Sequence, residues 1–249
     1  MTEVPKINIV EVAPIRMKYC VIGLPDVGLV GSIAAGYVIS SLKMDEVGYF
    51  ESDLFPPITV IHRGDPKAPF RLYGKGDLGV VISEVPVPVL AVPALARDLV
   101  DWLKSKGVQL LVSATGVAVQ NRLEIDTPEV YGVGASPSDK ELLNKAEIKL
   151  LEEGFMVGPY ALILRECTKQ EVPNIVLLAQ SHYQYPDPGA AASVLTSLNK
   201  LLGLSLDIEK LLKQTEQIRL RTRELMQRTR RSMISMQKAQ EQEIPSMYV

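Results

Sequence analysis

The sequence feature that most constrains the fold is a stretch of 37 residues, Asp207 to Glu243, that contains neither glycine nor proline. Its residues are mainly Glu, Gln, Arg, Lys, Leu and Met, which favour the α-helix. At about 1.5 Å per residue, one helix of this length would extend about 55 Å, farther than a small domain needs to cover its own core. The sequence therefore predicts one long C-terminal helix that protrudes from the rest of the protein or pairs with a second copy.

Along this predicted helix, a seam of positions recurs at alternating spacings of four and three residues, as in a coiled coil. Three of the positions hold threonine, so the seam is weak and favours helices that splay apart beyond an oligomeric base. A surface helix that lies on its own domain is the alternative. The seam consists of Ile208, Leu211, Thr215, Ile218, Thr222, Leu225, Thr229, Ser232 and Met236.

The same helix carries a cationic band, in which arginine occupies positions 219, 221, 223, 228, 230 and 231 and Glu224 is the single acid. Such a band could contact phosphates or an acidic protein surface. No aromatic residue for base stacking lies within it, and the chain has no recognisable nucleic-acid-binding motif. We therefore interpret the band as a solvated helix face and expect no nucleic-acid partner.

Short apolar runs alternate with helical patterns over residues 1–203, which predicts a layered α/β domain with a largely parallel core sheet and some antiparallel strands. One predicted helix begins at a capping box formed by Ser138 and Glu141 and ends before Gly154. The predicted strands span 6–12, 19–24, 45–51, 58–62, 70–74, 78–85, 109–114 and 174–179. The predicted helices span 28–43, 89–106, 138–153, 159–170 and 188–202.

Three parts are therefore expected: an α/β core domain at 1–203, the long helix at 204–244 and a flexible tail at 245–249. The composition, 47% hydrophobic and 22% charged, suffices for a sizeable core and excludes a wholly disordered chain. The net charge of −2 excludes a protein that is cationic as a whole.

Cysteine usage and hydropathy indicate a cytoplasmic protein. Cys20 and Cys167 lie far apart in apolar stretches, as buried thiols do in a reducing compartment. The first residues do not form a secretory signal. The apolar stretch from Tyr19 to Leu42 is interrupted by Pro25 and four glycines, so we expect no membrane span.

The glycine-rich segment 23–31 has the glycine spacing of a phosphate-binding loop, but Leu29 and Val30 stand where Lys and Ser or Thr would contact phosphate and metal. Pro25 occupies the second glycine of the dinucleotide-binding pattern. The segment is therefore better explained by packing, because small residues on one helical face let the helix approach a strand or a partner closely. These small residues are Gly28, Ser32 and Ala35. Asp26 is expected to accept hydrogen bonds from the first turn of that helix.

Residues for catalysis are sparse. The two histidines, His62 and His182, and the two cysteines form no zinc pattern, so we expect no metal and no cofactor. Ser181, His182 and Asp187 supply a hydroxyl, a base and a carboxylate, but they lie in a turn that needs polar groups in any case. The segment 134–138 lacks the second glycine of a nucleophile elbow. No catalytic residue is assigned.

Two segments resemble hallmarks of the proteasome assembly chaperone 2 family: 23–31 (GLPDVGLVG), leading into Ala34 and Ala35, and 186–192 (PDPGAAA), leading into Leu195. The resemblance covers residues 8–203. It implies an α/β fold similar to nucleoside phosphorylases and related hydrolases, used as a protein-binding scaffold rather than as an enzyme. A nucleoside phosphorylase-like or hydrolase-like enzyme with the same fold is the alternative.

The long helix and the ending Met247-Tyr248-Val249 resemble the archaeal branch of this family, which carries a C-terminal HbYX motif (hydrophobic, Tyr, any residue). The resemblance implies that Met247, Tyr248 and Val249 dock into pockets between α-subunits of the proteasome core particle. The protein would then assist assembly or open the gate without nucleotide. This mode of binding implies a homo-oligomer, with a tetramer favoured.

Overall fold

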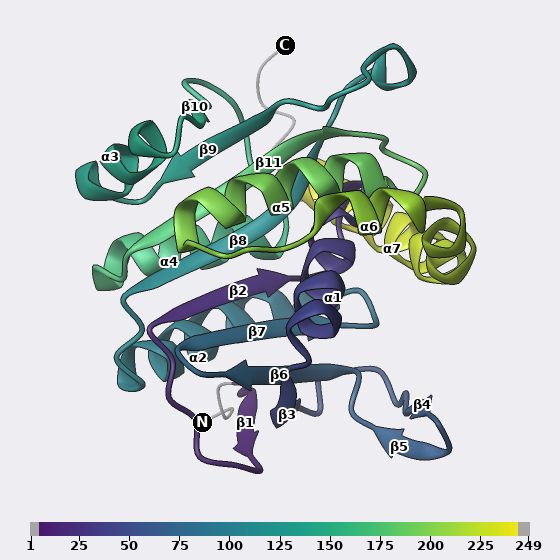
Figure 1. Ribbon diagram of the computed structural model, residues 1–249. Coiled ribbons are helices and arrows are strands. Elements are labelled where there is room, and N and C mark those ends of the chain that lie inside the picture. Colours follow the sequence, from purple (N-terminus) through teal and green to yellow (C-terminus); the bar gives the residue numbers. More distant parts are fainter. Residues whose placement is uncertain (1–4, 244–249) are drawn as a thin grey trace.

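A mixed sheet of nine strands forms the centre of the computed structural model, which describes residues 5–243 (Figure 1). In spatial order the strands are β1 (Asn8–Glu11), β3 (Asp45–Glu51), β6 (Phe70–Lys75), β7 (Leu78–Ser83), β2 (Tyr19–Gly23), β8 (Leu110–Ala118), β11 (Asn174–Ser181), β9 (Val130–Gly134) and β10 (Lys149–Leu150). The four central strands, β7, β2, β8 and β11, are mutually parallel. Antiparallel pairs extend the sheet on both sides.

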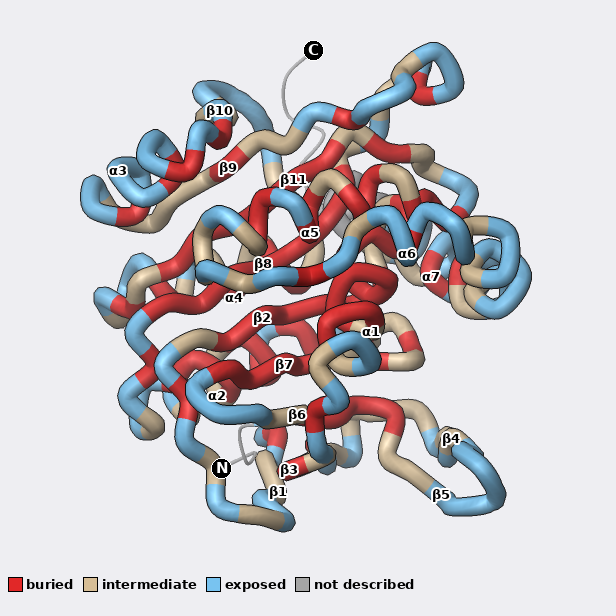
Figure 2. Tube along the Cα trace, in the orientation of Figure 1, coloured by how far each residue is buried: buried red, intermediate tan, exposed pale blue. Residues whose placement is uncertain are grey.

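Helices cover both faces of the sheet. One face carries α1 (Val30–Leu42) and α5 (Pro188–Leu202), and the other carries α2 (Val92–Ser105) and α4 (Pro159–Gln170). Because both faces are covered, the central strands are almost continuously buried, as Figure 2 shows. The remaining elements are α3 (Pro137–Lys145), α6 (Ile208–Lys213), α7 (Thr215–Glu243), the hairpin of β4 (Val60–His62) and β5 (Asp65–Lys67), and the 3-10 turns η1 (Val27–Leu29), η2 (Val89–Ala91) and η3 (Arg122–Glu124).

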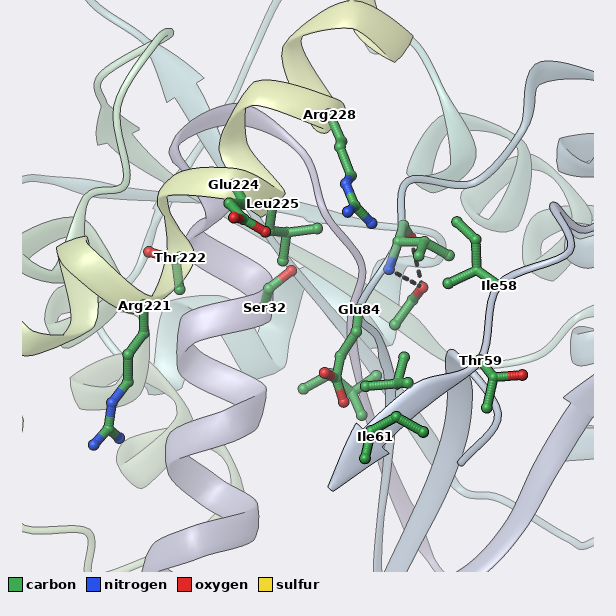
Figure 3. A pocket seen from close by; sticks show the side chains of 14 residues that line it. Ser32, Ile58, Thr59, Ile61, Glu84, Arg221, Thr222, Glu224, Leu225 and Arg228 are labelled. Carbon is green, nitrogen blue, oxygen red and sulfur yellow. Dashed lines mark hydrogen bonds between the residues drawn. The ribbon is translucent and has the colours of Figure 1, made fainter. Parts of the chain in front are cut away.

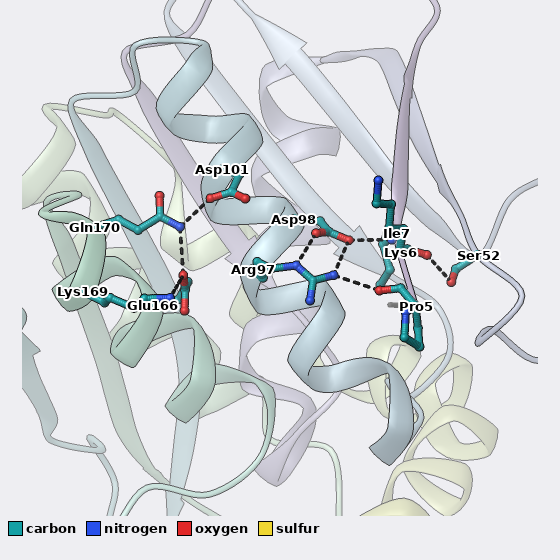
Figure 4. Close-up of polar contacts among 10 residues, drawn as sticks. All are labelled: Pro5, Lys6, Ile7, Ser52, Arg97, Asp98, Asp101, Glu166, Lys169 and Gln170. Atoms are coloured by element: carbon teal, nitrogen blue, oxygen red, sulfur yellow. Dashed lines mark hydrogen bonds and ion pairs between the residues drawn. The ribbon is translucent and has the colours of Figure 1, made fainter. Parts of the chain in front are cut away.

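Polar contacts fix the start of the chain and the two helices of one face (Figure 4). The amide of Ile7 donates to the Asp98 carboxylate at 2.7 Å, and Arg97 donates to the carbonyl of Pro5 at 2.8 Å. The Gln170 side chain on α4 donates to Asp101 on α2. These contacts attach the N-terminal segment to α2 and join α2 to α4.

The expected layered α/β domain with a long C-terminal helix is confirmed, and the strand at 45–51 and the helices at 159–170 and 188–202 have their predicted bounds. The capped helix was placed wrongly: α3 begins after Ser136, whose hydroxyl accepts from the Asp139 amide, and ends at Lys145. Its proline at the first position makes Ser136, rather than Ser138, the cap. Strands β5, β9 and β10 were not predicted, and β10 lies within the segment 138–153 that was expected to be helical.

The C-terminal helical stretch is also divided, contrary to the expectation of one continuous helix. Helix α6 ends at Lys213, the backbone of Gln214 (φ −100°, ψ 7°) leaves the helical region, and α7 begins at Thr215. The absence of glycine and proline therefore did not guarantee continuity. A change of direction at Gln214 lets α6 and α7 follow different parts of the body (Figure 1).

The start of α1 lies unusually close to two strands. A Cβ atom added at Gly31 would lie 2.0 Å from the carbonyl oxygen of Ala114 on β8. One added at Gly23, the last residue of β2, would lie 2.3 Å from the carbonyl oxygen of Gly31 and 2.4 Å from the Ala35 Cβ. These contacts support packing as the role of the glycine-rich segment, since glycine is the residue that permits such backbone approach.

Substitution of two glycines on the same helix tests this close approach. Gly31→Ala should lower the free energy of unfolding by about 3 kcal/mol, because the new methyl group overlaps a strand carbonyl and α1 must move. Gly36→Ala is the matched control, since its Cβ would meet only Ile82 Cδ1, at 3.8 Å. It should raise the free energy of unfolding by about 0.5–1 kcal/mol through helix propensity. Urea denaturation measures both, and equal effects would contradict the close approach.

Candidate functional site

Helix α7 turns the predicted seam toward its own body. Of the seam, Thr229 is 1% exposed, and Ile218 and Leu225 pack against the core on the α1–α5 face. Met226, next to the seam, is 3% exposed. Met236 packs against the core of the opposite face. Helix α7 is therefore a surface helix that lies on its own domain, which was the alternative to a coiled coil. Because its seam packs against the body, the seam is not free to pair with a second copy.

The six arginines of the cationic band are all exposed on α7. Exposure agrees with the predicted solvated face. Leu220 and Ile234, which are 64% and 38% exposed, lie on the same helix. The helix thus presents a cationic outer surface with isolated apolar residues.

The predicted docking residues Met247, Tyr248 and Val249 lie outside the described residues. The structure follows the chain to Glu243, the last residue of α7. The site that can be described is therefore the junction between α7 and the α/β body, together with the cluster at the ends of the central strands.

A cavity of about 490 Å³ lies at this junction (Figure 3). Helix α7 contacts η1 and η2, which directly follow β2 and β7, so it crosses the sheet edge where those strands end. The cavity is lined by Ser32 of α1, by the end of β7 with the two residues that come after it, by residues 58–61 and by α7. From α7 it receives Arg221, Thr222, Glu224, Leu225 and Arg228.

Glu84 on the cavity wall is held by a cationic partner. Arg71, which is 5% exposed, forms an ion pair with the Glu84 carboxylate. His62 Nε2 lies 2.7 Å from Glu84 Oε1 and 3.0 Å from an Arg71 nitrogen. Burial and the Arg71 charge lower the pKa of His62, so the ring is neutral at pH 7. The Arg71 guanidinium thus offsets the negative charge that Glu84 brings to the cavity.

The candidate catalytic residues do not form a catalytic array. Asp187 Oδ1 and Oδ2 accept two hydrogen bonds from Arg122, at 2.9 and 2.7 Å, and the carboxylate also caps α5 through the Ala190 amide. It meets His182 through the backbone amide, at 3.1 Å, and not through the ring. The Ser181 hydroxyl donates to the carbonyl of His182 at 3.4 Å. These contacts give Asp187 a structural role, as its place in a polar turn suggested. The sequence did not reveal its partner, because Arg122 is 65 residues away.

Among the residues that the structure describes, no group of three His, Cys, Asp or Glu could hold a metal ion. Both cysteines are buried free thiols, and burial raises the pKa of each to about 12. No helix within residues 5–243 is long and apolar enough to cross a membrane.

The family profile of the PAC2 family matches residues 20–226. The chain belongs to the PAC2 family. The crystal structure of Pyrococcus furiosus PbaA, described as an archaeal homolog of proteasome-assembly chaperone, superposes on this PAC2 protein with a TM-score of 0.85. The two chains are 33% identical, over 91% of this chain and 99% of PbaA.

Two further relatives are similar over most of their length. Pyrococcus furiosus PbaB, described as an archaeal proteasome activator, has a TM-score of 0.72 and 26% identity, over 88% of this PAC2 protein and 99% of PbaB. An uncharacterised protein of Methanocaldococcus jannaschii is 30% identical over 89% of this chain and 92% of its own length. The family resemblance carried by segments 23–31 and 186–192 is thereby confirmed.

Within the first of these segments, Asp26 does not cap a helix as predicted. Its carboxylate accepts a hydrogen bond from the Thr115 hydroxyl on β8, at 2.8 Å, and makes no capping hydrogen bond to η1. Burial raises the pKa of Asp26 to about 6, although the hydrogen bond from Thr115 favours the ionised form. The carboxylate therefore joins the glycine-rich segment to β8 at a cost in solvation.

Asp26→Asn tests this assignment through the pH dependence of stability. The pKa of Asp26 is higher in the folded than in the unfolded protein, so the folded state binds more protons and gains stability as the pH falls through about 6. Asn removes this titration and can still accept from Thr115. The stability advantage of the variant should shrink by about 1–2 kcal/mol between pH 8 and pH 5. A difference in the free energy of unfolding that does not change with pH would contradict the raised pKa.

Proposed function

We propose that this PAC2 protein is a proteasome-binding assembly chaperone or ATP-independent activator. In this proposal Met247, Tyr248 and Val249 dock into pockets between α-subunits of the proteasome core particle. The observation that carries it is the similarity along almost the whole chain to PbaA and PbaB, which are described as a proteasome-assembly chaperone homolog and a proteasome activator. The HbYX ending of the sequence is the second support.

The chemistry of the ending suits a pocket between two subunits. Met247 offers an apolar anchor, and Tyr248 offers an aromatic ring with a hydroxyl that can find a partner when buried. The carboxylate of Val249 is ionised at neutral pH and can pair with a cation of the pocket. The family resemblance leads us to expect a lysine as that cation.

The position of α7 supports the delivery of the tail. Met236 still packs against the body, and α7 continues from there to Glu243, about 10 Å farther along its axis. The body thus fixes the direction in which the chain leaves. Only Ile244, Pro245 and Ser246 then separate the helix from the docking residues.

A single tail of three residues should bind weakly, because its ordering on binding costs conformational entropy. Several tails on one oligomer raise the effective concentration and convert weak contacts into avidity. We therefore propose a homo-oligomer, with a tetramer favoured, whose subunits meet through surfaces other than the buried seam of α7. The protein would act in the cytoplasm as a binding scaffold, without nucleotide and without catalysis of its own.

Loss of the tail should abolish binding to an archaeal proteasome core particle. Deletion of 247–249 and Tyr248→Ala each remove the proposed contacts, and binding of the full-length protein by surface plasmon resonance should be lost or weakened by at least tenfold in each. Tyr185→Ala is the control, because Tyr185 is a tyrosine of the body that is 66% exposed. Its binding should match that of the unaltered protein.

Peptide hydrolysis in the same samples separates the two forms of the proposal. A rise in the rate of peptide hydrolysis that depends on Tyr248 would favour an activator. Binding without a rise in this rate would favour an assembly chaperone. Equal binding by the truncated and intact proteins would overturn tail docking, provided that circular dichroism and sedimentation show an unchanged fold and oligomer.

A further inference from the structure

The cavity beneath α7 lies at a topological switch point of the sheet. Strands β2 and β7 are parallel neighbours, and their carboxyl ends lie at the same edge. The chain leaves β2 into α1 on one face and leaves β7 into α2 on the opposite face. In open α/β sheets, a crevice forms where adjacent strands lead to opposite faces, and ligands bind there.

A buried hydroxyl in this cavity has no partner within the described part of the chain. Ser32 is 8% exposed, and its Oγ atom makes no hydrogen bond to residues 5–243. It lies in the first turn of α1, at the positive end of the helix dipole, and lines the cavity. A buried polar group normally has a partner, so this hydroxyl is available to bond to the head group of a ligand.

The charges around the hydroxyl favour an anion. Arg228 extends from α7 over the cavity, and Arg221 lies two turns earlier on the same helix (Figure 3). On the wall, Glu84 is already paired with Arg71. Glu224 is the remaining acid of the lining, and the two arginines of α7 outnumber it. The guanidinium of Arg228 and the hydroxyl of Ser32 therefore stand on two sides of one space.

Apolar side chains form much of the remaining lining, together with Thr59, Ser83 and Thr222. The volume of about 490 Å³ is within the range of small-molecule sites. We propose that this cavity binds a small amphipathic anion, which carries a carboxylate or phosphate head on a short apolar body. The head would bind Arg228 and accept a hydrogen bond from Ser32. The body would pack against Ile58, Val60, Ile61, Ile82, Val85 and Leu225.

Isothermal titration calorimetry of the full-length protein at constant ionic strength tests the site, with phenyl phosphate, octanoate and inorganic phosphate as probes. Phenyl phosphate or octanoate should bind saturably with one site per chain, and the one that binds identifies the head group. Inorganic phosphate should bind at least tenfold more weakly, because it lacks the apolar body. Inorganic phosphate that binds as tightly as phenyl phosphate would contradict the amphipathic ligand.

Two variants and a matched control locate the binding. Arg228→Ala should weaken it by tenfold or more, as expected for loss of a hydrogen bond between charged groups. Ser32→Ala should weaken it severalfold while leaving the thermal midpoint of the free protein unchanged or higher, because the lost hydroxyl has no protein partner. Arg230→Ala removes an arginine of the same helix that does not line the cavity, and binding should be unchanged.

The proposal is overturned if neither amphipathic anion binds saturably. It is also overturned if Arg230→Ala weakens binding as much as Arg228→Ala, because the anion would then be held by the diffuse charge of the helix. Neither result depends on the proteasome, so failure here leaves tail docking untouched.

Discussion

The close approach of α1 to the backbones of β2 and β8 is the constraint on which the rest of the structure depends. Gly23 and Gly31 allow it from one side. From the other side, the buried Tyr160 hydroxyl of α4 accepts from the Leu24 amide at 2.6 Å and donates to the Leu24 carbonyl at 3.0 Å. Gly28, at φ +62°, turns the chain against Ser181 at the end of β11. The segment between β2 and α1 is thus fixed from both faces of the sheet, and with it the crevice at the strand ends.

Helix α7 completes this edge of the molecule, and its weak seam acquires a physical explanation. Buried threonine is costly unless its hydroxyl is bonded, and both Thr222 and Thr229 donate to the carbonyl four residues earlier, at 2.7 and 2.8 Å. Their methyl groups can then pack on the body. A seam of this kind suits a helix held by its own domain and leaves the arginines at the surface. The proposed functions therefore involve the cavity beneath α7 and the residues after Glu243 rather than the seam.

The sequence predicted the elements that carry strong local signals. Helix α5 has Pro188 at its first position and ends at Gly203 in the left-handed conformation, and both signals placed its bounds correctly. The start of α3 was misplaced because Ser136 and Ser138 both offered a cap. Pro137 at the first helical position and the capping box of Ser136 with Asp139 identify the first as the cap. The break at Gln214 likewise occurs without a glycine or proline, so the sequence pattern did not predict it.

The site was less predictable than the fold because its residues are distant in sequence. Arg122 and Asp187, or Ser32, Glu84 and Arg228, come together only through the sheet order. The docking residues are the opposite case, since Met247, Tyr248 and Val249 were found from a three-residue ending and their role stays a prediction.

The most direct test of tail docking is the position of Tyr248 in the complex. A photoreactive benzoylphenylalanine at position 248 of the full-length protein, irradiated with an archaeal proteasome core particle, would report its nearest neighbours by mass spectrometry. Tail docking predicts cross-links to residues at the boundary between two adjacent α-subunits, and their suppression by an excess of a peptide with the ending Met-Tyr-Val. Cross-links confined to other surfaces, or none while the protein is bound, would contradict it.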